Sequence, residues 1–416
     1  MQNLFHENRI FRSFLMFSTF MGIGRGMFGI FMMWVVHALF YNPMYTGIAG
    51  FMFGAPFVAS FIVGPLVDRW NKARALQITC FVYLCVTALI LAANIIFTPG
   101  VWLYFLSIFV FCLATLFNAP AHTAFLPRIV KGEDLIKANA LMNITGIIGG
   151  IGVAVVLYLS LAGGADFILV YAFNTAFMFI ALLFAVFLRS DESTEDAEKS
   201  DKATFKLYFS ELKMGLSFVK KGLMLPLVIA AIFMSFFADV THVNLPRFAE
   251  YHLGTASGFI ILSGLALLGG LVGSYICRMT EARLELWKIL VGAFIAAGVT
   301  RILFVNNIAD NYTRAILIYI LYVGLGSAIG IFYRAIVQKL PPKNLISRVD
   351  TTITSLRAVA AAIGALAGGA LGTLLYRVDL VFIIQGVSYI LIGLCLCLSK
   401  HVRSLPKIAD LAEKHI

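Results

Sequence analysis

Long apolar runs, separated by short polar connections, fill almost the whole chain. Most runs hold 18 or more predominantly apolar residues, which is about the length that an α-helix needs to cross the hydrocarbon core of a bilayer. The pattern predicts twelve membrane-spanning helices, at residues 11–39, 45–66, 75–97, 101–125, 138–162, 166–188, 223–250, 257–277, 286–308, 314–336, 351–375 and 379–399.

The composition excludes a soluble protein. Hydrophobic residues make up 61% of the chain and charged residues only 13%, whereas soluble domains are about half apolar and about a quarter charged. The chain cannot bury so much apolar surface in a core of its own, so the bilayer has to act as its solvent. We therefore expect an all-α membrane protein.

The formal net charge of +11 reflects membrane topology. Lysine and arginine gather at the N-terminus, in alternate connections, at 189–221 and in the tail 400–414, whereas the opposite face has only Arg314, Arg377 and Arg247. Cytoplasmic segments carry such an excess of basic residues, so both termini are predicted to be cytoplasmic. The basic residues also attract anionic lipid headgroups, and they indicate no nucleic-acid partner.

A charged stretch without aromatic residues, Arg189 to Thr204, divides the chain into two sets of six spans. Its composition predicts a mobile linker, and residues 205–221 have the pattern of an amphipathic helix on the cytoplasmic leaflet. We expect four segments: an N-terminal six-helix half (1–188), a cytoplasmic linker with that helix (189–222), a C-terminal six-helix half (223–400) and a cytoplasmic tail (401–416).

The two halves resemble each other weakly. The sequence FLPR at 125–128 follows the fourth span and KLPP at 339–342 follows the tenth, and a glycine-rich span comes after each. Two pseudo-symmetric six-helix halves are the arrangement of rocker-switch transporters. The glycines allow the fifth and eleventh spans to approach other helices closely, and packing alone is the simpler explanation for them.

The sequence does not indicate cofactor chemistry or catalysis. All six cysteines lie in apolar spans, and none has the spacing of a zinc site. There is no nucleotide-binding loop of the GxxxxGK type, no activated serine and no pair of catalytic acids. We expect no metal, no cofactor and no enzyme activity.

A short charged segment, GPLVDRWNKAR at 64–74, lies between two apolar runs. Membrane proteins keep charge near the bilayer where it orients the chain or takes part in a mechanism. Asp68 comes directly after an apolar helix, and Arg69, Lys72 and Arg74 follow within two turns. This spacing suits a cytoplasmic loop that latches one helix end to another.

Three segments resemble the major facilitator superfamily: the loop at 64–74, APAHTAFLPRIVKGEDLIKAN at 119–139 and ELKMGLSF at 211–218. The chain looks like the branch of macrolide, multidrug and enterobactin exporters and, nearly as closely, like bacterial lysophospholipid flippases. The resemblance covers nearly the whole chain. It implies the major facilitator fold, a bacterial inner-membrane location and a gating role for Gly64, Asp68, Arg69, Lys72 and Arg74.

Arg25 lies near the centre of the first span, between Gly24 and Gly26. A charge so deep in a span is costly and indicates a function. The resemblance implies that the first span lines the central cavity, where Arg25 would bind an anion or orient the substrate. The alternative is a structural pair with Asp239 or with the carbonyl end of a helix.

Asp239 is the only carboxylate clearly within a span, and His242 shares its helix face because it lies three residues further on. A histidine can titrate near neutrality, so the pair is a candidate for taking up and releasing a proton as the cavity opens to either side. The alternative is a fixed bridge from Asp239 to Arg25 that closes the outer gate. Both hold if protonation breaks the bridge.

Asn244 and Pro246 follow this pair within about a turn. Proline removes a helical hydrogen bond, which predicts either a break in the seventh span, usable as a hinge of the outer gate, or a simple helix end. Phe236 and Tyr333, with Phe237 and Phe332, are candidates for an aromatic pocket around a bulky ligand. Arg301, on the ninth span, is expected to extend its charged end toward the membrane surface.

Together, the residues and the resemblance favour a secondary active transporter. It would export a bulky amphiphilic small molecule of the drug, macrolide or siderophore class by alternating access, with protons as the coupling ion. The alternatives are a flippase for a lysophospholipid or another lipid intermediate and an importer of a small solute. By analogy with the superfamily we expect a monomer in contact with membrane lipid.

Overall fold

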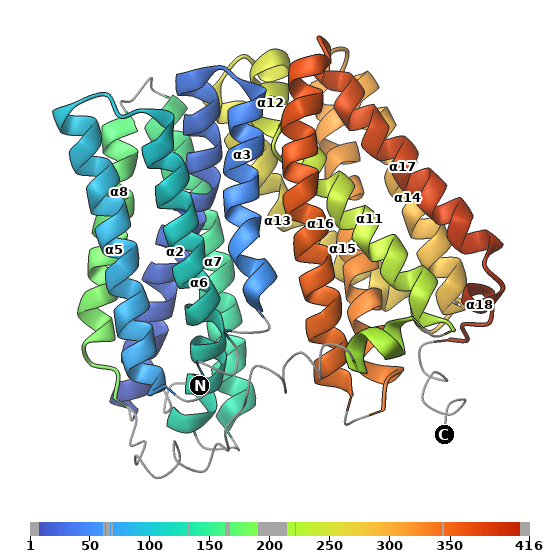
Figure 1. Ribbon diagram of the computed structural model, residues 1–416, viewed down its shortest axis with the longest axis horizontal. Coiled ribbons are helices and arrows are strands. Elements are labelled where there is room, and N and C mark those ends of the chain that lie inside the picture. Colours follow the sequence, from blue (N-terminus) through green and yellow to red (C-terminus); the bar gives the residue numbers. More distant parts are fainter. Residues whose placement is uncertain are drawn as a thin grey trace. The chain divides into compact units, whose positions relative to one another are not determined.

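The computed structural model contains helices and no strand in the residues that it describes (Figure 1). These residues are 8–60, 63, 67, 70–130, 134–162, 167–189, 214–220, 222–342 and 345–407. Their helices are α2 (Arg9–Phe40), α3 (Pro43–Gly54), η1 (Ala55–Ala59), α5 (Lys72–Ile96), α6 (Val101–Ile129), α7 (Leu135–Ala162), α8 (Phe167–Ala185), α11 (Met224–His242), α12 (Leu245–Leu253), α13 (Ala256–Thr280), α14 (Leu286–Asn307), α15 (Tyr312–Lys339), α16 (Ile346–Leu374), α17 (Val378–Leu398) and α18 (Lys400–Arg403).

The long helices coincide with the predicted spans, and most of their ends agree within about one turn. Among the described residues, 11 helices are long and apolar enough to cross a membrane. The predicted span 45–66 corresponds to α3 and η1, and part of it lies outside the described residues. The all-α membrane fold is confirmed, whereas the count of twelve spans and the cytoplasmic location of both termini stay predictions.

The seventh predicted span is broken near its end. α11 ends at His242 and α12 begins at Leu245, with Pro246 in its first turn. The Asn244 side chain spans the break, because its Nδ2 donates to Val240 O at 2.9 Å and to Gly368 O of α16 at 2.8 Å. Of the two outcomes that the sequence leaves open, the structure shows a break, and its use as a hinge stays a prediction.

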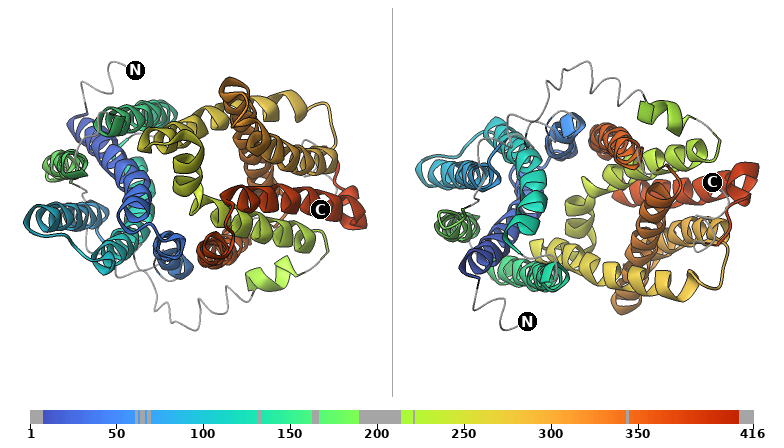
Figure 2. Two further views of the ribbon diagram at one scale, coloured as in Figure 1. Left: turned by 90° about the horizontal axis from the view of Figure 1, so that it is seen from above. Right: turned by 90° about the horizontal axis from the view of Figure 1, so that it is seen from below.

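The helices fall into two compact units, each with its own set of packed helices. Figure 2 shows the helices of each unit side by side. Both α3 and α13 contribute residues to both units. Unit 1 comprises 1–41, 52–204 and 255–261, and unit 2 comprises 42–51, 205–254 and 262–416.

In unit 1, α2 packs against α6, α7 and α8, and α5 packs against α6 and α8. Two glycines bring α2 close to its neighbours: a Cβ at Gly24 would lie 2.7 Å from Met178 Cε of α8, and one at Gly26 would lie 3.2 Å from Val153 of α7. Asn174 of α8 adds a hydrogen bond, donating its Nδ2 to Gly24 O at 2.6 Å. The middle of α2 is therefore held firmly against both α7 and α8.

In unit 2, α14 packs against α15 and α17, and α11 packs against α16 and α17. Backbones meet directly at Gly298 of α14 and Gly386 of α17, where a Cβ on Gly298 would overlap Gly386 O. The start of α3 belongs to this unit, and a Cβ at Gly47 would lie only 2.7 Å from Gly369 Cα of α16. Close backbone contact of this kind is how helices associate where lipid leaves little hydrophobic driving force.

Most of the amphipathic helix predicted at 205–221 lies outside the described residues. Residues 214–219 are helical, and Gly215 packs directly against Thr352 and the Arg348 carbonyl of α16. The location of this helix on a membrane leaflet and the four-segment division of the chain stay predictions.

Candidate functional site

A cavity of about 470 Å³ opens among α2, α6 and α7 of unit 1. This volume lies within the range of small-molecule sites, about 300–1,000 Å³. Amide, hydroxyl and imidazole groups share its wall with apolar side chains, and Arg25 is the one permanently charged residue of the described lining. The described lining consists of Ser18, Met21, Gly22, Arg25, Asn118, Ala119, His122, Thr123, Leu126, Asn139, Met142, Asn143, Thr145 and Gly146.

Arg25 is half-buried, and its guanidinium makes no hydrogen bond or ion pair with any residue that the structure describes. One turn earlier, Gly22 leaves open space beside the helix, since a Cβ there would meet no atom within 4 Å. A cation within a membrane span is costly unless an anion or polar group compensates it. Arg25 is therefore placed to receive an anion from the cavity.

Asn118 and His122 of α6 add two oriented polar groups to the same wall. Asn118 Nδ2 donates to Thr79 Oγ1 at 2.8 Å, and its Oδ1 is fully buried without a partner in the described residues. His122 Nε2 lies 2.8 Å from Ser18 Oγ, and its ring packs against Phe14 with 4.8 Å between centroids. The cavity wall thus combines a guanidinium with an imidazole.

Asp239 and His242 lie at the C-terminal end of α11, as expected from their spacing. His242 is exposed and Asp239 is partly buried, and the Asp239 carboxylate makes no hydrogen bond or ion pair in the described part of the chain. Asp239 lies within electrostatic range of His242 and of Arg357 on α16. The proton-carrying role of this pair and the bridge from Asp239 to Arg25 stay predictions.

Tyr333 of α15 is buried beside Arg357 in unit 2. The Arg357 guanidinium lies 6.0 Å from the Tyr333 ring centroid, and its Nε donates to Ser235 Oγ of α11 at 2.9 Å. Both residues line a small hollow of about 20 Å³, which is too small for a bulky ligand. Phe236 does not line this hollow and has its backbone against Gly364 of α16, and the aromatic pocket stays a prediction.

The predicted gating loop is only partly described. Gly64, Asp68 and Arg69 lie outside the described residues. Lys72, at the start of α5, is 2% exposed and donates its Nζ to Trp70 O at 2.9 Å. Arg74 is exposed and its backbone N–H donates to the capping residue Asn71. The gating role of the loop, like that of Asn244 and Pro246, stays a prediction.

Arg301 does not reach the membrane surface, and the expectation for this residue was wrong. Its side chain is 3% exposed and lies between the rings of Tyr322 and Phe382, 4.4 Å from each centroid. Its Nε and Nη1 have no hydrogen-bond partner in the described residues. Cation–π contact compensates part of the cost of burying the charge, an arrangement that helix position alone does not reveal.

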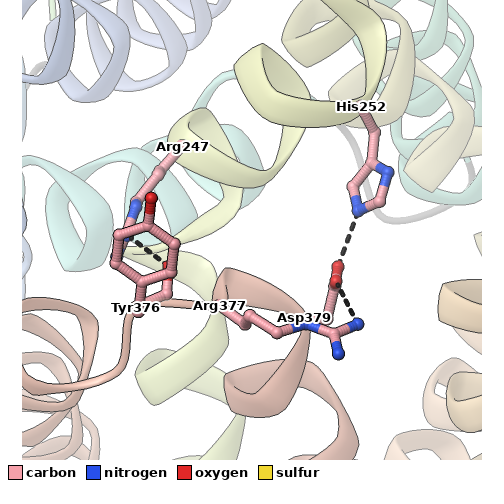
Figure 3. A network of polar contacts seen from close by, with 5 residues as sticks. All are labelled: Arg247, His252, Tyr376, Arg377 and Asp379. Atoms are coloured by element: carbon pink, nitrogen blue, oxygen red, sulfur yellow. Dashed lines mark hydrogen bonds and ion pairs between the residues drawn. The ribbon is translucent and has the colours of Figure 1, made fainter.

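Sequence reasoning also missed a polar network between α12 and the first turn of α17 (Figure 3). His252 Nε2 lies 2.6 Å from Asp379 Oδ1, and Arg377 Nη2 lies 3.4 Å from Asp379 Oδ2. The side chains of His252 and Asp379 are only 10% and 8% exposed. No spacing signals this pair, because 127 residues separate its members.

Comparison with known families gives a match to the model of the Major Facilitator Superfamily over residues 14–355. Among curated proteins, the enterobactin exporter EntS of Salmonella choleraesuis (strain SC-B67) is 24% identical over 378 residues, which are 86% of this chain and 84% of EntS. The uncharacterised MFS-type transporter YkuC of Bacillus subtilis (strain 168) is 23% identical over 295 residues. That match covers 66% of this chain and 65%, slightly less than two thirds, of YkuC.

Solved structures share the fold at low sequence identity. The nucleoside transporter NupG aligns with a TM-score of 0.72 and 11% identity, covering 94% of this chain and 98% of NupG. The peptide transporter POT in complex with sulfate aligns with a TM-score of 0.70 and 14% identity, covering 95% of this chain and 96% of POT. At these identities the likeness concerns the fold alone.

Proposed function

Since the chain belongs to the Major Facilitator Superfamily, we propose that it exports a bulky amphiphilic small molecule by alternating access. Membership of this family makes it a multi-pass transporter of the bacterial inner membrane rather than an enzyme. The drug, macrolide and siderophore classes are the substrates that we consider first. Protons are the proposed coupling ion. Export as the direction of transport receives support from the weak similarity to EntS.

The observation that carries the proposal is the cavity of unit 1. Arg25 supplies a cation without a partner in the described residues, and His122 supplies an imidazole on the same wall. Met21, Leu126 and Met142 offer apolar surface on the same wall. A molecule with a polar, anionic end and an apolar body matches this lining, since a guanidinium pairs well with carboxylate or phosphate oxygens and methionine adapts to varied apolar shapes.

The same lining supports a flippase as the second candidate. In that case Arg25 would hold the phosphate of a lysophospholipid, and the apolar side chains would contact the start of its acyl chain. The two candidates differ in energy coupling, because a proton-driven exporter must exchange protons for substrate. Asp239 is the proposed proton carrier, with His242 and Arg357 as its charged neighbours.

Proton release on ligand binding tests the proposal. Purified protein in weakly buffered detergent would receive macrolides, siderophores and lysophospholipids in turn, and the pH of the solution would be recorded. We expect the transported class to release protons from the wild type and not from Asp239→Asn. Asp310→Asn, at an exposed aspartate after α14, is the matched control and should release protons as the wild type does.

The outcomes separate the candidates. Release that Asp239→Asn abolishes and Asp310→Asn preserves identifies the ligand class and supports a proton-coupled exporter. Tight binding of lysophospholipid without proton release would replace the exporter by the flippase. Binding of none of the three classes would contradict both and leave the import of a small solute.

A further inference from the structure

α12 is a short helix with tethers of different kinds along its length. At its start, Asn244 is hydrogen-bonded to Gly368 O of α16. In its first turn, Arg247 donates to the carbonyls of Gly372 and Tyr376, at the end of α16 (Figure 3). These tethers join permanent donors to backbone acceptors, so pH does not change them in the physiological range.

The tether at the other end of α12 is different, because both of its partners can be ionised. His252 lies one residue before the last residue of α12, and its 2.6 Å contact with Asp379 ties this end to α17. Gly254, with φ of 69°, then ends the helix in the left-handed conformation, which glycine adopts without steric cost. The His252–Asp379 pair is thus a titratable tether at the end of α12.

We propose that His252 and Asp379 form a proton-binding site that controls the docking of the C-terminal end of α12 on α17. A protonated His252 makes a charge-assisted hydrogen bond to the Asp379 carboxylate, and such bonds are about twice as strong as neutral ones. A neutral His252 retains at most an ordinary hydrogen bond. Because histidine changes its charge between about pH 5 and pH 8, acid docks this end of α12 and alkali loosens it.

The surroundings place a further cation and a helix N-terminus beside Asp379 and shield the pair from water. Arg377 contributes a second cation at 3.4 Å from the carboxylate, and Asp379 lies in the first turn of α17, where the helix dipole favours a negative charge. On α12 itself, Arg247 and Glu250 are the other charged side chains. From α14, Arg301 faces this region, since it stacks on Phe304 and Phe382.

Aromatic packing covers the inner side of the pair. The Phe248 ring lies 4.5 Å from the His252 ring and 4.2 Å from Phe382 of α17, between centroids. This contact persists when the charge on His252 is lost. Deprotonation therefore loosens the end of α12 without expelling the whole helix.

In the proposed exporter, a proton taken up by this site would dock α12 after the substrate has left. This place in the transport cycle rests on the proposed function. Docking itself does not need a substrate. It can be measured on the empty protein, so the two proposals fail or succeed independently.

Hydrogen–deuterium exchange, read by mass spectrometry on the full chain in detergent, tests the site. After correction for the intrinsic pH dependence of exchange, the amides of 249–254 should exchange about fivefold more slowly at about pH 5.5 than at about pH 8. Asp379→Asn and His252→Gln should lose this difference, because neither can form the charged pair. His401→Gln, at an exposed histidine on α18, should keep it.

A substitution by arginine distinguishes charge from shape. His252→Arg carries its charge at every pH in this range, so the end of α12 should stay protected at pH 8 as well. The proposal fails if the wild type shows no pH dependence at 249–254, a result that needs no variant. It also fails if His252→Gln keeps the wild-type profile while the amides of α17 show that the variant is folded.

Discussion

Arg25→Gln is expected to abolish transport in a protein that still folds. The guanidinium has no partner in the described residues. Its removal therefore leaves no opposite charge of the protein unpaired. The substrate, in contrast, loses the one permanent charge that the described part of the cavity wall offers. Loss of one member of a buried charged pair costs about 2 kcal/mol or more, which corresponds to at least about 30-fold weaker binding. Binding to purified protein and efflux from loaded vesicles would both report it.

Arg25→Lys and Arg12→Gln make this prediction specific. Lysine keeps the charge but loses the planar fork that matches carboxylate or phosphate, so we expect intermediate binding. Arg12 lies on the same helix α2 but does not line the cavity, and its replacement should leave binding unchanged. If Arg25→Gln bound and transported the substrate as well as the wild type does, the cavity of unit 1 would not be the substrate site.

Gly298→Val is expected to disrupt the core of unit 2. The added Cβ would overlap Gly386 O and lie 2.9 Å from Ile390 N, both of them backbone atoms of α17 that cannot swing aside. Overpacking costs about 1–3 kcal/mol even where side chains can adjust. Here the two helices must separate, and lipid provides little force to hold them together. We expect the apparent Tm in detergent to fall by roughly 5–10 °C.

Gly292→Val, on the same helix, is the matched control. A Cβ at Gly292 meets nothing within 4 Å, so the change has the same intrinsic effect on α14 without a clash. Its thermal unfolding should resemble that of the wild type. Equal loss of stability in both variants would show that valine destabilises α14 itself and that the contact with α17 contributes little.

The helices could be predicted from the sequence because the bilayer imposes one strong rule on each. Every span has to be apolar over its full length and to satisfy its own backbone hydrogen bonds. Each span is therefore visible in the sequence as a long apolar stretch. The break before Pro246 was visible as one of two outcomes for the same local reason. That Asn244 stabilises the break was not visible, since its partner Gly368 belongs to another helix.

Side-chain partners were much harder to predict. Arg301 looked like a peripheral cation, yet rings from two other helices enclose it, and sequence does not fix the rotation of those helices. His252 and Asp379 lie near the ends of different helices, where each alone resembles an ordinary surface residue. Arg25 was the exception, because a charge in the middle of an apolar run is conspicuous whatever surrounds it.

The uneven attachment of α12 has a consequence for rates. Its start is fixed to α16 through Asn244 and Arg247, so only its last turn needs to move when the tether at His252 loosens. Local motions of this size take nanoseconds to microseconds, whereas collective movements of helices take microseconds to milliseconds. The end of α12 therefore reaches equilibrium with the surrounding pH many times within one turnover. Its state makes the transport rate depend on pH, although its own motion is not rate-limiting.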